Sequence, residues 1–87
     1  METQEVLYKL KQILVEVGEL DIKSEQLDEN NKNLFEEYNF NSILALEFLL
    51  KIEENFNIEI DDEDLDSKLL NDLSYLAEYV RNMCENG

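Results

Sequence analysis

Apolar residues recur at helical spacing over residues 3–17. They fall at intervals of three and four, which places them on one face of an amphipathic helix: Val6, Leu7, Leu10, Ile13, Leu14 and Val17. Thr3 stands where a side chain can cap the start of this helix, and Gly18 is expected to end it.

Three further helices are predicted, over residues 42–55, 63–69 and 72–84. The last carries its apolar stripe at Leu73, Leu76, Ala77 and Val80. Residues 18–41 read as a long polar connection, with one helical turn expected near Leu34–Tyr38. Sparse apolar anchors interrupt this connection: Leu20, Ile22, Leu27, Leu34 and Phe35.

The only alternating segment, Ile58–Ile60, has no partner strand. The chain of 87 residues is long enough for one domain with a modest core. We therefore expect a single all-α domain over residues 1–87: a small four-helix bundle with a long first loop and a short third helix.

The helix predicted over 42–55 has two apolar faces. Five residues are expected on its core side: Ala45, Phe48, Leu49, Ile52 and Phe56. Ile43, Leu46 and Leu50 fall together on the opposite side. One interpretation is a central helix that is buried all round. The alternative is an exposed apolar strip rimmed by carboxylates, which is the composition of a docking surface.

The charge of the chain excludes several functions. With 22 acids, 7 bases and no histidine, its formal charge is −15. Such a charge repels nucleic acid and anionic membranes and attracts proteins with basic patches. Without histidine there is no Ser-His or Cys-His nucleophile and no imidazole zinc ligand, so no catalytic and no metal residue is predicted.

The single cysteine, Cys84, has no disulfide partner within the chain, which suits a reducing compartment. No signal segment and no apolar run of membrane-spanning length occurs. We expect a soluble, cytoplasmic monomer.

The acidic run over 61–64, with Asp66 just beyond it, suggests a calcium-binding loop, since Asp62, Asp64 and Asp66 have alternate spacing. However, Ser67 stands where such a loop needs glycine, and Leu73 stands where it needs a bidentate glutamate. A calcium sensor is therefore rejected, and these acids are read as a solvated face.

Ser42 lies where a polar loop turns into the apolar helix. Asn41 or Ser42 can cap that helix, and most serines at helix starts do nothing more. A hydroxyl at a helix N-terminus is also well placed to carry a phosphate, because backbone donors and the helix dipole favour negative charge there.

The residues around Ser42 resemble the signature region of acyl and peptidyl carrier proteins. The resemblance rests on Asn41-Ser42-Ile43-x-x-Leu46-Glu47 followed by the run from Lys51 to Ile60, and it extends over essentially the whole chain through Leu34–Tyr38 and Asp72–Val80. It implies that Ser42 carries 4′-phosphopantetheine, donated by coenzyme A through a separate transferase. The arm would hold acyl, aminoacyl or peptidyl cargo as a thioester, while partner enzymes perform the chemistry.

The same resemblance implies a docking surface for partners with basic patches, including the phosphopantetheinyl transferase and the loading, condensing or tailoring enzymes. Its residues would be Ile43, Leu46, Glu47, Leu50, Glu53 and Glu54. The chain itself would be a carrier and not an enzyme.

The chain departs from the family at Asn41, where aspartate is usual, and Leu44 and Phe48 make its helix more apolar. These departures favour a discrete carrier of a thiotemplate pathway, such as nonribosomal peptide or polyketide assembly. The alternatives are a fatty-acid synthesis carrier and a D-alanyl carrier. The alternative from another class is a helical interaction module with no prosthetic group, in which Ser42 is only a cap.

Overall fold

Helices make up all the regular structure in the residues that the computed structural model describes, 2–28 and 30–86, the side chains of Asp62, Ser67 and Asn86 excepted. Residues 1, 29 and 87 of the expected domain lie outside this set. The elements follow in the order α1 (Thr3–Gly18), the 3₁₀ turn η1 (Ser24–Gln26), α2 (Leu34–Glu37), α3 (Ser42–Phe56), the 3₁₀ turn η2 (Asp62–Asp64), α4 (Ser67–Asn71) and α5 (Leu73–Asn86).

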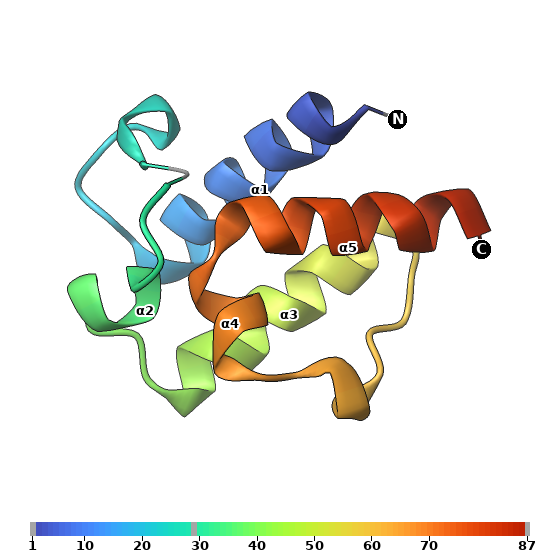
Figure 1. Ribbon diagram of the computed structural model, residues 1–87. Coiled ribbons are helices and arrows are strands. Elements are labelled where there is room, and N and C mark those ends of the chain that lie inside the picture. The colour runs from blue at the N-terminus through green and yellow to red at the C-terminus, as the bar shows by residue number, and fades with distance from the viewer. Residues whose placement is uncertain (1, 29, 87) are drawn as a thin grey trace.

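The three long helices form the body of the domain. Helix α1 packs against both α5 and α3, and the short α4 packs against α5 and α2 (Figure 1). The apolar stripes predicted for α1 and α5 face one core, in which Val6, Leu10, Phe48, Ile52, Leu69, Leu73, Leu76, Ala77 and Val80 have no exposed surface. The all-α bundle expected from the sequence is confirmed.

Both ends of α1 differ from the expectation. Thr3 is already inside the helix, because Glu2 occupies the capping position, without a side-chain cap. Gly18 is also helical, and the chain leaves the helix at Glu19 in a left-handed conformation (φ 49°). Gly18 instead provides space: a Cβ atom there would stand 2.6 Å from Cζ of Phe40. The glycine thus lets the Phe40 ring pack directly on α1.

The long connection over 18–41 is held by its predicted anchors. Leu27 and Leu34 are buried in the core. The start of α2 is tied to the end of α4, because the side-chain oxygen of Asn71 accepts a hydrogen bond of 2.8 Å from the backbone N–H of Phe35. These contacts explain how so long a loop stays close to the helices.

The helix predicted over 63–69 is wrong in position. Before residue 67 the chain makes only the η2 turn, and α4 runs from Ser67 to Asn71, so it overlaps only the end of the predicted range. The cause is Asp66, whose carboxylate accepts a hydrogen bond of 2.8 Å from the N–H of Leu69 and so caps a helix that starts after it.

The last helix begins one residue later than expected and extends beyond residue 84, to Asn86. Asp72 stands just before it and accepts a hydrogen bond of 3.1 Å from the N–H of Tyr75. It also forms a 3.0 Å ion pair with Lys32 of the long connection. Burial alone would raise the pKa of the Asp72 carboxyl, but the Lys32 ammonium and the backbone donors outweigh it, so the pKa lies below its usual value.

A hydrogen bond holds the acidic segment between α3 and α4 against α5. The hydroxyl of Tyr79 donates a hydrogen bond of 2.8 Å to the carboxylate of Asp64. Burial, reinforced by this bond and by the charge of Asp64, raises the pKa of Tyr79 to about 12. The neutral phenol is therefore the form that the folded chain favours.

The stability contributed by Tyr79 should depend on pH. Because its pKa is raised from 10.0 to about 12 on folding, the contribution is complete below pH 10 and is lost as the pH rises towards 12. We expect Tyr79→Phe to lower the free energy of unfolding in urea at pH 7, and the difference from the wild type to shrink at pH 11. An equal difference at both pH values would contradict this assignment.

Candidate functional site

The head of α3 is capped by Asn41, not by Ser42. The Asn41 side-chain oxygen accepts a hydrogen bond of 2.9 Å from the N–H of Leu44. Ser42 is the first helical residue and is exposed, and its hydroxyl has no hydrogen-bond partner among residues 2–28 and 30–86. The hydroxyl is therefore available for other chemistry.

The other serines differ from Ser42 in their surroundings. Ser24 is half-buried, and its hydroxyl donates a hydrogen bond of 3.1 Å to Glu25. Ser74 is half-buried and has an interaction partner. The side chain of Ser67 lies outside the described residues. Of the three serine side chains that the structure describes, Ser42 alone is exposed and unpartnered.

An aromatic cluster of Phe35, Phe40 and Phe48 packs at the head of α3. The rings of Phe35 and Phe40 lie 4.8 Å apart between centroids, and those of Phe35 and Phe48 lie 6.1 Å apart. Through Phe40 the cluster reaches Gly18 of α1. The turn that carries Ser42 is thus anchored to three helices by rings that are stiff and bulky.

The two faces predicted for α3 are present. On the core side Phe48, Leu49, Ile52 and Phe56 are buried, while Ala45 is half-buried. On the opposite side the exposed fractions are 69% for Ile43, 58% for Leu46 and 51% for Leu50. The interpretation that α3 is buried all round is therefore wrong. We call Ile43, Leu46 and Leu50 the exposed strip.

The acids beside the exposed strip are not equivalent. Glu47 and Glu54 are exposed. Glu53 is half-buried, and its carboxylate accepts a hydrogen bond of 2.9 Å from the N–H of Ile60. Glu53 therefore holds the segment that follows α3, a structural task that the sequence did not reveal.

Two acids of the run compared with a calcium loop have structural partners. Asp64 accepts from Tyr79, and Asp66 caps α4. The side chains of Asp62 and Ser67 lie outside the described residues. Among the side chains that are described, no group of three or more potential ligands could hold a metal ion. No helix within the described part of the chain is long and apolar enough to cross a membrane.

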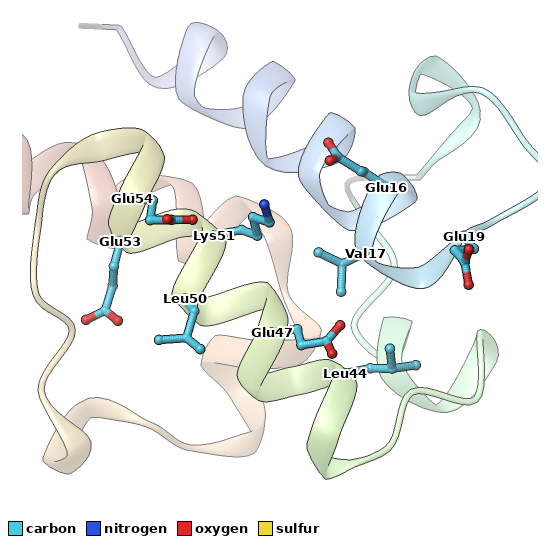
Figure 2. A pocket seen from close by; sticks show the side chains of 9 residues that line it. All are labelled: Glu16, Val17, Glu19, Leu44, Glu47, Leu50, Lys51, Glu53 and Glu54. Atoms are coloured by element: carbon cyan, nitrogen blue, oxygen red, sulfur yellow. The ribbon is translucent and has the colours of Figure 1, made fainter.

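A groove between α1 and α3 was not anticipated from the sequence. It has a volume of about 920 Å³, and Leu50 of the exposed strip is among the residues that line it (Figure 2). We call it the α1–α3 groove; it is lined by Glu16 and Val17 of α1, by Glu19 just after that helix, and by Leu44, Glu47, Leu50, Lys51, Glu53 and Glu54 of α3. The available signal was the pair Glu16 and Glu19 at the end of a helix, where basic residues are usual.

The cap geometry separates the roles of Asn41 and Ser42. We expect Asn41→Ala to lower the free energy of unfolding by about 1 kcal/mol, because a donor at the head of α3 loses its partner. Ser42→Ala should change it by less than about 0.5 kcal/mol. Urea unfolding of the two variants side by side measures this. A loss at Ser42 as large as that at Asn41 would show that the serine is a cap.

Comparison with known proteins agrees with this geometry. Residues 9–80 match the family described as "Phosphopantetheine attachment site". The chain is also 34% identical over 74 residues to the acyl carrier protein of Buchnera aphidicola subsp. Schizaphis graminum (strain Sg), an alignment that covers 85% of this chain and 87% of that protein. No solved structure gives a significant match. The chain belongs to the phosphopantetheine-binding family of acyl and peptidyl carrier proteins.

Proposed function

We propose that Ser42 is the residue that carries the arm. The cofactor of this carrier is covalently attached 4′-phosphopantetheine, whose terminal thiol holds the cargo as a thioester. The observation that carries the proposal is the exposed, unpartnered hydroxyl of Ser42 at the head of α3, where Asn41 already supplies the cap.

The electrostatics around Ser42 fit a phosphodiester. Although the chain has 22 acids, residues 38–46 contain no charged side chain. The N–H groups of Ser42 and Ile43 open α3, so the positive end of the helix dipole lies beside the serine oxygen. The neutral Asn41 caps the helix without bringing a carboxylate next to the phosphate. These features favour a negative group at this point of an otherwise acidic protein.

A carrier of this family meets a phosphopantetheinyl transferase and further enzymes that act on the cargo. We propose that these partners dock on the exposed strip, with Glu47 and Glu54 contacting basic residues at its rim. Glu53 would contribute less than the other two acids, because Ile60 already occupies its carboxylate. The carrier itself would hold cargo in the cytoplasm without performing catalysis.

For the pathway we favour a discrete carrier of thiotemplate assembly, such as nonribosomal peptide or polyketide synthesis. The neutral Asn41 and the apolar residues Leu44 and Phe48 support this choice. The second candidate is a carrier of fatty-acid synthesis, which the similarity to a protein named acyl carrier protein favours. Mass analysis of the cargo on protein isolated from its source cells separates them: an aminoacyl or peptidyl group supports the first, and a growing fatty acyl chain supports the second.

The proposal for Ser42 predicts a change in mass. After incubation with coenzyme A, magnesium and a broad-specificity phosphopantetheinyl transferase, the wild type should gain one phosphopantetheine and Ser42→Ala should gain none. Intact-mass spectrometry reads both results. The variant is expected to fold, since the hydroxyl makes no hydrogen bond within the described part of the chain. Modification of Ser42→Ala would refute the proposal.

The docking proposal predicts a loss of recognition without a loss of stability. Leu46→Lys should lower the kcat/KM of the transferase by about tenfold or more, because a cation would face a basic partner. Its free energy of unfolding should change by less than about 0.5 kcal/mol, since Leu46 lies outside the core.

Tyr8→Lys is the matched control for Leu46→Lys. Tyr8 is 52% exposed on α1, close to the 58% of Leu46, so the change in charge and the loss of exposed apolar surface are alike. The control should retain the wild-type kcat/KM. Equal losses in the two variants would show that the exposed strip is not the docking surface.

A further inference from the structure

The α1–α3 groove runs along most of α3, from Leu44, close to Ser42, to Glu54 near the end of the helix. Helices α1 and α3 run antiparallel: Val17, near the end of α1, and Leu44, near the start of α3, line the same groove. At the opposite end of the pair, the ammonium of Lys9 lies 5.8 Å from the centre of the Phe56 ring. An enzyme that reaches Ser42 therefore comes close to the end of α1 as well as to α3.

The groove combines apolar surface with carboxylates. Val17, Leu44 and Leu50 supply its apolar part. In Figure 2 the side chains of Leu44 and Glu47 extend from α3 towards the end of α1. Five glutamates line the groove, against the single ammonium of Lys51. The carboxylate of one of them, Glu53, is held by the N–H of Ile60, which leaves four others: Glu16, Glu19, Glu47 and Glu54. A segment that presents an apolar side chain between cationic ones is complementary to such a surface.

The acids at the end of α1 lie where the helix dipole disfavours negative charge. Glu16 and Glu19 are at the negative end of the helix dipole, and the last turn of α1 contains no basic residue. Lysine at either position would favour the helix. Local choices that oppose stability in this way are expected at functional surfaces.

We propose that the α1–α3 groove binds a segment rich in lysine or arginine on the transferase that modifies Ser42. The inference rests on the function proposed above and extends the docking surface from α3 to α1, adding Glu16, Val17 and Glu19. A second copy of this chain is a poor occupant, because each copy carries a formal charge of −15. Glu47 belongs to both the groove and the rim of the exposed strip, so one partner can cover the two surfaces together.

The test compares single charge changes in the transferase reaction with coenzyme A. Glu19→Lys should lower kcat/KM by roughly fivefold or more at low salt, with a smaller effect at high salt. Its melting temperature should be at least that of the wild type, since lysine suits the end of α1. Lys51→Gln, which removes the only cation lining the groove, should raise kcat/KM.

Glu78→Lys is the matched control for Glu19→Lys. Glu78 is exposed on α5 and does not line the groove, and its replacement changes the net charge by the same amount. The control should keep kcat/KM close to the wild-type value. An equal fall in both variants would show that only the overall charge matters and would overturn the inference, as would an unchanged kcat/KM for Glu19→Lys. If the wild type itself is not modified, the assignment of Ser42 fails instead.

Discussion

The packing of one face of α3 against the core determines which side chains of this helix are exposed at the site. Phe48 and Ile52 have no exposed surface, and burial of each such side chain contributes about 1.5–3 kcal/mol. This burial sets the rotation of α3 about its own axis. Once the rotation is set, Ile43, Leu46 and Leu50 must face solvent. The side of α3 that stabilises the fold is therefore opposite the side that we propose for recognition.

The distribution of charge complements this division. The chain is strongly acidic, yet the stretch around Ser42 contains no charged side chain. Carboxylates instead surround the apolar strip and the groove beside it. A positively charged enzyme would thus be attracted to the carrier as a whole, and the neutral head of α3 favours the phosphodiester that we propose on Ser42. Some acids, such as Asp66 and Asp72, serve the fold by capping helices.

The sequence predicted the helices that have strong periodicity and the two faces of α3, because the spacing of apolar residues follows directly from helical geometry. The prediction of helix boundaries failed where a single side chain determines the residue at which a helix begins. The short helix after α3 begins later than predicted because Asp66 caps it. Gly18 was expected to end α1, but it lies within the helix. The absence of a side chain there leaves the space in which the Phe40 ring packs. The α1–α3 groove was missed because it forms between two elements distant in sequence.

The central claim is that Ser42, and no other serine, carries the arm. Its most direct test is proteolysis of the modified wild-type protein followed by tandem mass spectrometry, which assigns the added group to one of four serines: Ser24, Ser42, Ser67 or Ser74. The account predicts phosphopantetheine only on the peptide that contains Ser42. Phosphopantetheine on a peptide that contains any of the other three would contradict it.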